Sequence, residues 1–255
     1  MTTAVTATSI TISEDQWLSD LFGYSVFRAN VDSADEVILS ELRDHFQRQR
    51  LALYYAKVGV TNVEIIQGLQ EAGFSVVDTN VTLSLASSAI EALAPRSQPV
   101  VIGEAKASNQ ADILRIAETC FRHTRFHLDP KIPMETANRI KREWMNNCLT
   151  GNRGDRVFVS YDRDQVTGFL ASLVTHDGNR PTAVIDLIGV DPTFQGLGVG
   201  AALTRAFIDY YSADVDEMLV GTQIANTTSL RLYQKLGFII TRSAYVLHKH
   251  LDSAS

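Results

Sequence analysis

The sequence of 255 residues contains only two cysteines, Cys120 and Cys148, which are too few for a disulfide framework. No stretch approaches the ~18 apolar residues that a membrane-spanning helix requires. The first residues, Met1-Thr2-Thr3-Ala4, lack the positively charged segment that begins a secretory signal peptide. These absences predict a cytoplasmic protein with no membrane partner, in which both cysteines are small buried side chains.

Basic residues are also few, since 23 Lys and Arg stand against 29 Asp and Glu and give a formal net charge of −6. A nucleic-acid-binding surface usually carries a basic stripe, so we expect no nucleic-acid partner. The six histidines form no His-Glu-x-x-His motif and have no cysteine partners at zinc-ligand spacing, so we expect no metal site. His248 and His250 alternate on a terminal strand, and we expect them on a solvated face.

The most informative stretch is the glycine-rich run Gln195–Gly200. The segment Val184–Val190 before it is short and rich in β-branched residues, which predicts a buried strand. From Ala201 onward apolar residues recur at helical spacing, which predicts a helix whose first turn is the glycine run. Glycines let the backbone approach a ligand closely, and the N–H groups of a helix start attract anions such as a pyrophosphate.

The glycine run admits more than one interpretation. Gly196-x-Gly198-x-x-Ala201 fits the loose dinucleotide-binding fingerprint. That fold places its glycines directly after the first strand and needs several further strand–helix units. Here Asp191–Gln195 intervene, and the chain ends too soon after Gly200 for such units. A glycine-rich turn without a ligand is the second alternative, and the third rests on a resemblance.

Two motifs decide between these alternatives by resemblance. Gln195, Gly198 and Gly200 fill the pattern Gln/Arg-x-x-Gly-x-Gly/Ala, which resembles the acetyl-CoA signature of the GCN5-related N-acetyltransferase (GNAT) superfamily. The segment Asn226–Phe238 resembles the superfamily motif N-x-x-[AS]-x-x-x-Y-x-x-x-G-F at every defined position.

The resemblance implies a mixed α/β (α+β) sheet of the GNAT fold, with acetyl-CoA as the cofactor. It implies that the backbone near Ile188–Val190 holds the thioester carbonyl, that Gln195–Gly200 hold the pyrophosphate and that the helix starting at Asn226 contacts the cofactor arm. The expected cofactor-binding residues are Ile188, Gly189, Val190, Gln195, Gly196, Leu197, Gly198, Val199, Gly200, Asn226, Ser229 and Tyr233. Asn226 can equally serve as a helix N-cap.

The first part of the chain repeats the second. Tyr54–Phe74 aligns without gaps onto Met218–Phe238, which predicts strand, helix, Gly-Phe turn and strand twice. Leu69 stands where Tyr233 stands, and no glycine-rich loop precedes the first copy. A chance helix–glycine–strand pattern is the alternative explanation. We therefore predict a disordered tail (1–12), a degenerate half-GNAT domain (13–85), a linker (86–98) and a GNAT domain (99–255) that binds one acetyl-CoA.

A narrower resemblance, to dTDP-fucosamine acetyltransferases, covers most of the chain. Its segments are Arg125-Phe126, Ala137 to Trp144 with Asn147, Gly221-Thr222-Gln223 with Asn226-Thr227, and Ser243-Ala244-Tyr245 with Leu247. Those enzymes carry a half-size N-terminal domain and acetylate the 4-amino group of a nucleotide-linked deoxysugar, so the resemblance implies an acceptor of this class. We expect His123–Pro130, between two predicted helices, to form a loop of the acceptor pocket.

Acetyl transfer to an amine requires an acid for the leaving thiolate and a base for the amine. Tyr233 is the candidate acid, because a phenol is protonated at neutral pH. The resemblance places the base at Asp78, acting through water, and Asp186 on the strand is the other candidate. Two further functions stay open, namely a GNAT acting on a peptide N-terminus or another small amine, and a non-catalytic acyl-CoA-binding module. The sequence also leaves open a homodimer.

Overall fold

The computed structural model describes residues 10–92, 100–177 and 180–252. By its internal contacts the chain divides into two compact units. Unit 1 comprises the chain up to Asn80, Leu128–Lys131 and the chain from Ser243, and unit 2 comprises Val81–His127 and Ile132–Arg242. Two long strands, β4 (Ser75–Ala86) and β10 (Ile239–Leu251), contribute residues to both units.

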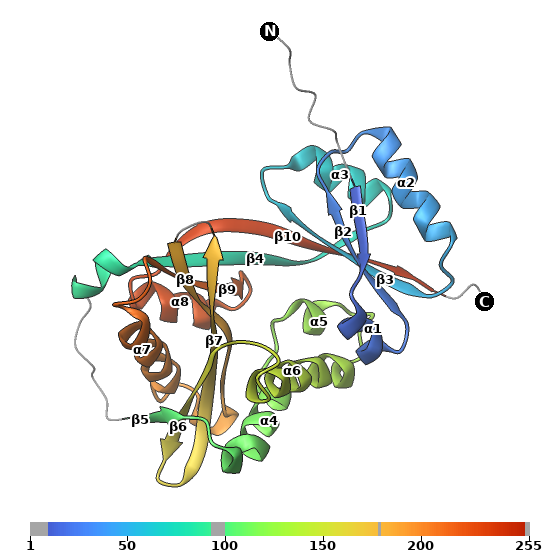
Figure 1. The fold of residues 1–255 in the computed structure, drawn as a ribbon. Helices are drawn as coiled ribbons and strands as arrows, with labels where there is room; N and C mark the ends of the chain where they lie inside the picture. Colours follow the sequence, from blue (N-terminus) through green and yellow to red (C-terminus); the bar gives the residue numbers. More distant parts are fainter. Residues whose placement is uncertain (1–9, 93–99, 178–179, 253–255) are drawn as a thin grey trace. The chain divides into compact units, whose positions relative to one another are not determined.

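Unit 1 is a sheet with helices from the first third of the chain (Figure 1). Its elements are β1 (Ile10–Glu14), α1 (Gln16–Phe22), β2 (Ser25–Val31), α2 (Glu36–Gln47), β3 (Ala52–Gly59), α3 (Val63–Glu71) and the unit 1 parts of β4 and β10. The strand order is β1-β2-β3-β10-β4. β2 and β3 pair in parallel, whereas β1 with β2 and β3 with β10 pair antiparallel.

The core of unit 1 lies between one face of this sheet and the helices α2 and α3. Tyr54 and Leu247 from the strands pack there with Phe46 of α2 and Leu69 of α3. Successive strand residues point to opposite faces, so His248 points away from this core. His248 is nevertheless only 2% exposed, and the expectation of a solvated face for His248 and His250 is wrong. Both side chains contact Asp129 on the second face of the sheet.

Unit 2 carries the remaining elements. They are the 3₁₀ helix η1 (Ser87–Ala92), β5 (Val101–Glu104), the 3₁₀ helix η2 (Ala107–Asn109), α4 (Gln110–Thr119), α5 (Arg125–Leu128), α6 (Met134–Leu149), β6 (Arg156–Asp162), β7 (Gln165–Asp177), β8 (Arg180–Val190), the 3₁₀ helix η3 (Pro192–Phe194), α7 (Val199–Tyr211), β9 (Glu217–Gln223) and α8 (Thr227–Lys235). The strand order is β4-β9-β8-β7-β6-β5. β8 and β9 are parallel, whereas β5 to β8 pair antiparallel in sequence.

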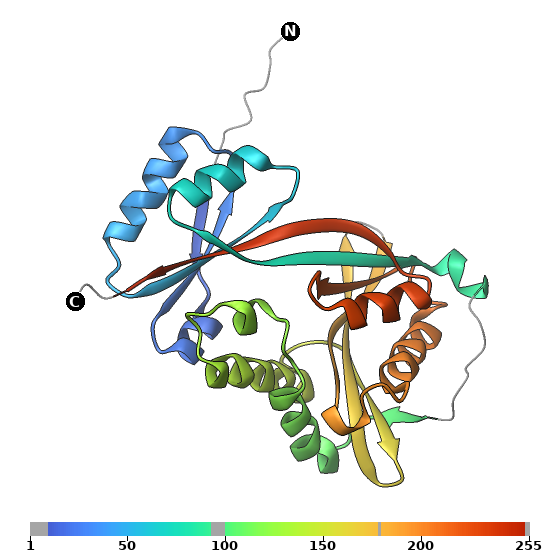
Figure 2. The same ribbon diagram turned by 180° about the vertical axis from the view of Figure 1, so that it is seen from behind.

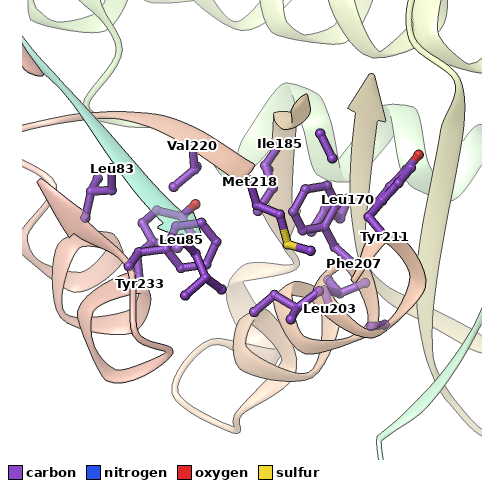
Figure 3. Packing of buried hydrophobic residues seen from close by; sticks show 14 of the residues in the cluster. Leu83, Leu85, Leu170, Ile185, Leu203, Phe207, Tyr211, Met218, Val220 and Tyr233 are labelled. Atoms are coloured by element: carbon purple, nitrogen blue, oxygen red, sulfur yellow. The ribbon is translucent and has the colours of Figure 1, made fainter. Parts of the chain in front are cut away.

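Helices cover both faces of the unit 2 sheet, with α7 and α8 on one side and α4 and α6 on the other (Figures 1 and 2). On the first face, Leu203 and Phe207 of α7 and Tyr233 of α8 gather with strand residues such as Met218 (Figure 3). On the second face, residues of α4 and α6 pack against β6 and β7. Burial on both faces explains the continuous apolar character of these strands.

A β-bulge interrupts β8 at Asp186. Ala171 of β7 pairs with Leu187 and the next residue, Ser172, pairs with Ile185, so Asp186 is the extra residue. The bulge reverses the alternation of side chains, because Ile185 packs on the α7 face and Leu187 packs on the α4 face. Side chains that would share one face of a regular strand therefore point to opposite faces of the sheet before and after Asp186.

The internal repeat predicted from the sequence coincides with the observed elements. With Asn62 placed on Asn226, α3 (Val63–Glu71) falls on α8 (Thr227–Lys235) and the start of β4 on the start of β10. Both asparagines are N-caps with nearly the same backbone angles, and both Gly73 and Gly237 have positive φ, at 90° and 85°. The two copies are therefore alike in backbone as well as in sequence.

Several local expectations differ from the structure. β1 begins at Ile10, so residues 10–12 of the predicted tail form a strand, and residues 1–9 lie outside the described residues. Part of the predicted linker forms η1, and its residues 93–98 also lie outside the described residues. The expected loop contains the short helix α5, and α7 starts at Val199, after most of the glycine run. In the described part of the chain, no helix has the length and apolarity needed to cross a membrane.

Candidate active site

The site starts where β8 and β9 separate. The two parallel strands pair from Thr182 with Glu217 to Ile185 with Val220. β8 then continues to Val190, still paired with β7, and β9 continues to Gln223. The separation begins next to the Asp186 bulge, because the bulge turns the edge of β8 away from its neighbour. The two strands are therefore splayed beyond Ile185.

Beyond the separation, β8 offers backbone donors on its free edge. Backbone N–H groups along a strand point alternately to its two edges. Asp191 N–H donates to Thr167 O of β7 at 2.9 Å, so every second N–H group counted back from Asp191 also points to β7. By this alternation the N–H groups of Ile188 and Val190 point to the other edge. Such fixed donors can stabilise a carbonyl oxygen on which negative charge develops.

The glycine-rich loop adopts a conformation that other residues resist. Gly196 and Gly198 have φ of 79° and 83°, in the left-handed region where a Cβ is strained. Gly198 is the N-cap of α7, which leaves the first N–H groups of this 13-residue helix without intrahelical partners. Asp191 fixes the start of the loop by accepting from Thr193 and from Arg115 Nη2 at 2.9 Å.

A cavity of about 390 Å³ lies over this loop. It is lined by the free edge of β8 with the end of β9, the glycine loop with the start of α7, one face of α8, and the segment Cys120–Thr124 that follows α4. From the predicted cofactor set it includes Ile188, Gly189, Val190, Gln195, Gly196, Gly198, Val199, Gly200, Asn226, Ser229 and Tyr233. Leu197 is the exception, because its side chain is 57% exposed. The structure thus brings together residues that the sequence places in separate motifs.

A second cavity, of about 100 Å³, adjoins the first. Seven residues line both: Phe121, Thr124, Ile188, Gln223, Asn226, Ser229 and Tyr233. The smaller cavity also reaches Lys141 of α6, Asp186 of β8 and Thr222 of β9. It therefore joins the larger cavity to a pocket with buried charged groups.

Tyr233 stands at the junction of the two cavities. Its side chain is 2% exposed and belongs to the core cluster of the α7 face (Figure 3). Burial raises the pKa of Tyr233 well above its usual range, so the phenol is protonated at neutral pH. A protonated hydroxyl between two cavities can donate a hydrogen bond or a proton to a group bound in either one.

Asp186 is engaged by several donors. Arg153 donates to both carboxylate oxygens at 2.6 Å, and Trp144 Nε1 donates to Oδ2 at 2.8 Å. A bidentate Arg–carboxylate pair fixes the orientation of the carboxylate and occupies both of its oxygens. This geometry favours a positioning role for Asp186 over the role of general base that the sequence left open.

Lys141 is a functional candidate that the sequence analysis missed. It is 7% exposed, and its Nζ lies 4.3 Å from the Trp144 ring centroid and 5.2 Å from that of Phe121. Burial lowers the pKa of Lys141 to about 8, against the opposing effect of Asp186. The available signal was its position, because Lys141, Trp144 and Cys148 share one helical stripe.

Thr124, His127 and Asn138 form a second group. The sequence placed Thr124 and His127 in the expected acceptor-pocket loop without a chemical role, and it missed Asn138. His127 Nε2 lies 3.0 Å from Asn138 Oδ1, and Thr124 Oγ1 lies 2.6 Å from His127 Nδ1. An amide oxygen only accepts, so Nε2 carries the proton and Nδ1 accepts from the threonine hydroxyl. Burial lowers the pKa of His127, which keeps the ring neutral at pH 7. Because Thr124 lines both cavities, this chain of hydrogen bonds ends at the site.

The remaining predicted residues have observed structural roles. Asn226 Oδ1 accepts from Ser229 N–H at 3.2 Å, which confirms the N-cap role. Gln195 Nε2 donates to Val190 O at 3.3 Å and ties the loop to β8. Cys120 lines the larger cavity, and burial raises the pKa of its thiol to about 12, so it is a poor nucleophile. Asp78 is buried on β4 in unit 1, and its role as a base stays a prediction.

Comparison with known proteins identifies the family. The model of the acetyltransferase (GNAT) family matches residues 111–238, half of the chain, and spans the cavities described above. The chain belongs to the GNAT family. Its mixed sheet, splayed β8 and β9, and glycine loop before α7 are the GNAT fold that the two motifs predicted.

Two curated relatives and one solved structure are similar to this GNAT chain. The spore coat polysaccharide biosynthesis protein SpsD of Bacillus subtilis is 27% identical over 58% of this chain, which spans only half of the length of that protein. The dTDP-fucosamine acetyltransferase of Escherichia coli O6:H1 is 24% identical over 76% of this chain and 80% of its own. A GCN5-related N-acetyltransferase from Kribbella flavida shares the fold, with a TM-score of 0.61, 17% identity, and coverage of 98% of this chain and 89% of its own.

The buried lysine gives a first prediction. The folded chain releases the Lys141 proton above pH about 8, whereas the unfolded chain holds it to about 10.5. Between these values the unfolded state binds more protons, so the free energy of unfolding rises with pH, by at most about 3 kcal/mol from this group. We expect Lys141→Met to be more stable than the wild type at pH 7 and to lose this advantage at pH 10, as measured by urea unfolding. Lys106→Met, at an exposed lysine, is the control; the same pH dependence in K141M as in the wild type would contradict the assignment.

Proposed function

We propose that this chain is an acetyl-CoA-dependent N-acetyltransferase that acetylates the amino group of a nucleotide-linked amino deoxysugar. The observation that carries the proposal is the position of Tyr233, a protonated phenol that lines both a large cavity over the glycine loop and a small polar cavity. If a thioester in the large cavity met an amine in the small cavity, both groups would lie within reach of the Tyr233 hydroxyl. Proximity of this kind is a major source of rate enhancement.

The larger cavity fits an acyl-CoA. The loop at Gly196 and Gly198 has a backbone that only glycine adopts easily, and it opens α7 with donors suited to a pyrophosphate. Arg122, a further lining residue, adds positive charge. The N–H groups of Ile188 and Val190, on the edge of β8 that does not pair with β7, would hold the thioester carbonyl. When bound, the cofactor supplies an activated acetyl group. We propose one cofactor per chain, because the first copy of the repeat has Leu69 at the tyrosine position and lacks the glycine loop.

The acceptor class rests on relatives. The Escherichia coli relative is named a dTDP-fucosamine acetyltransferase, and the Bacillus subtilis relative a polysaccharide biosynthesis protein. The small cavity would take the amino end of the acceptor, since Thr124, Thr222 and Lys141 provide polar contacts there. Identities of 27% and 24% support a sugar-nucleotide class and do not single out one sugar.

In the proposed reaction the acceptor amine would attack the thioester carbon, and Tyr233 would give its proton to the thiolate that leaves. A phenol of pKa about 10 gives its proton to a thiolate of pKa about 8.5 only at a cost of about 2 kcal/mol, if the two were free in water. Burial raises the pKa of Tyr233 further, so its proton would move as the C–S bond breaks and not beforehand. Transfer of the Tyr233 proton in the same step as C–S cleavage would avoid a free thiolate in an apolar pocket.

For the base we propose the chain Thr124–His127–Asn138. The amine would pass a proton to the Thr124 hydroxyl as that hydroxyl gives its own proton to His127 Nδ1. Asn138 would hold the ring in the required tautomer, since its Oδ1 accepts from Nε2. Asp78 acting through water remains the alternative base.

The proposed activity is tested by thiol release from acetyl-CoA with a panel of acceptors. We expect release with dTDP- or UDP-linked amino deoxysugars and its loss in Gly198→Asp, because a charged side chain would enter the pyrophosphate site. Gly151→Asp is the matched control, since Gly151 also has positive φ, at 76°, with open space around it. Release only with peptides or small amines would indicate the second function, and binding of acetyl-CoA without release would indicate a non-catalytic module.

Tyr233→Phe tests the acid. The change keeps the ring and removes the proton, so acetyl-CoA affinity should hardly change. We expect kcat and kcat/KM to fall together by about 10²–10⁴-fold, equivalent to roughly 3–5 kcal/mol. Tyr211→Phe is the matched control, because it removes a buried hydroxyl that bonds Ser172 outside the cavities. A Tyr233→Phe enzyme with normal kcat and rate-limiting chemistry would make Tyr233 a packing residue.

His127→Gln and Thr124→Val test the base. Since burial lowers the pKa of His127 below 6.5, the neutral ring persists at pH 7 and its loss should reduce kcat/KM by about 10²-fold or more. The acid limb of the wild-type pH profile, which falls as the ring is protonated, should disappear in His127→Gln. His176→Gln, at an exposed histidine, should leave the profile unchanged. An acid limb that persists in His127→Gln would move the base to another group, with Asp78 next.

A further inference from the structure

Unit 1 contains a cluster of metal-ligating side chains that the proposed reaction does not use. Asp129, His248 and His250 come together from two segments of this unit. The side chains of Asp129 and His248 are 3% and 1% exposed, and that of His250 is 11% exposed. Two imidazoles and a carboxylate buried at one point are unusual, because ionisable side chains are seldom buried without specific partners.

The sheet of unit 1 explains how the histidines meet. His248 and His250 are two residues apart on β10, so both point to the same face. Their cross-strand partners on β3 are Tyr55 and Leu53. Leu53 and its own neighbour on β2, Val26, are fully buried on that face. The imidazoles therefore lie over an apolar surface.

Asp129 follows α5 in the segment Leu128–Lys131, which belongs to unit 1. Its two oxygens have different partners. Oδ1 accepts from Lys131 N–H at 2.9 Å, which fixes the carboxylate orientation. Oδ2 lies 2.6 Å from His248 Nδ1 and 2.8 Å from His250 Nε2. The candidate ligand atoms of the three residues all lie within 4.8 Å of one another.

We propose that Asp129, His248 and His250 bind one divalent transition-metal ion, with Zn²⁺ the best match. Imidazole nitrogen and carboxylate oxygen are ligands that Zn²⁺ prefers, at about 2.0–2.2 Å. A tetrahedral ion with such bonds separates neighbouring ligand atoms by about 3.3 Å. The two N···O distances of 2.6 and 2.8 Å would therefore lengthen by about 0.5–0.7 Å, and the two nitrogens, which lie within 4.8 Å of each other, would take the same spacing. The backbone hydrogen bond to Oδ1 is the kind of outer contact that orients a carboxylate ligand.

The exposure of the three residues indicates where further coordination would occur. His250 is the most exposed of them, so the solvent side of the ion lies next to it. Three protein ligands with water in the fourth position would complete the coordination. Such an ion would fix the segment Leu128–Lys131 to β10, two parts of unit 1 that lie far apart in the sequence. The competing explanation is a metal-free cluster in which both imidazoles donate hydrogen bonds to Oδ2.

The test uses the full chain, freed of any histidine tag and dialysed against a chelator. We expect Co²⁺ to bind with one equivalent per chain and to give a visible absorption band without the near-ultraviolet sulfur charge transfer of thiolate ligation. Zn²⁺ should displace it. X-ray absorption of the Zn²⁺ form should show nitrogen and oxygen neighbours with imidazole scattering.

Variants locate the ion. Asp129→Asn and His250→Gln should each weaken Zn²⁺ binding by about 100-fold or more and remove the Zn²⁺-dependent rise in Tm. His45→Gln is the matched control, because His45 is a partly buried histidine of unit 1 that bonds Tyr54 instead. Should Asp129→Asn fail to fold, His250→Gln, at the more exposed position, decides. The proposal is overturned if the wild type binds no stoichiometric Co²⁺ or Zn²⁺, if thiolate ligation appears, or if His250→Gln binds as the wild type does.

Discussion

The separation of β8 from β9 after Ile185 is the constraint on which the rest of the site depends. Two parallel strands that stayed paired would use the N–H groups of Ile188 and Val190 in the sheet. Because the strands part at the Asp186 bulge, these donors become available and a space opens between sheet and α8. The bulge carries a charged residue into the interior, and Arg153 and Trp144 satisfy it. One extra residue in a strand thus creates both the cavity and its polar wall.

The two copies of the internal repeat share one backbone arrangement, but only the second copy contributes to the candidate active site. α3 and α8 begin at equivalent asparagines and end at equivalent glycines, and Leu69 and Tyr233 occupy the same buried position. The difference lies in this side chain, an isobutyl group in one copy and a phenol in the other, and in the loop that precedes the copy. A leucine completes an apolar core, whereas a tyrosine at the core boundary brings a polar group to a cavity. Packing alone therefore does not require the tyrosine.

Both units bury charged or ionisable side chains, and each such group has specific partners. Lys141 lies over two aromatic rings near Asp186, and Asp129 contacts two histidines. Burying a charge costs free energy unless its partners replace water well. Such groups add little to the stability of a fold. Both clusters are therefore candidates for a functional role.

The sequence by itself determined the family, the fold class, the glycine loop and the repeat. These signals are local, since Gln195–Gly200 and Asn226–Phe238 are contiguous and glycine at positive φ or an asparagine cap is a property of a few neighbouring residues. Only the tertiary structure revealed the Thr124–His127–Asn138 chain, the buried state of Lys141 and the Asp129–His248–His250 cluster. The sequence placed His248 and His250 in solvent because alternation on a strand fixes which residues share a face, whereas packing of a distant segment decides whether that face is buried.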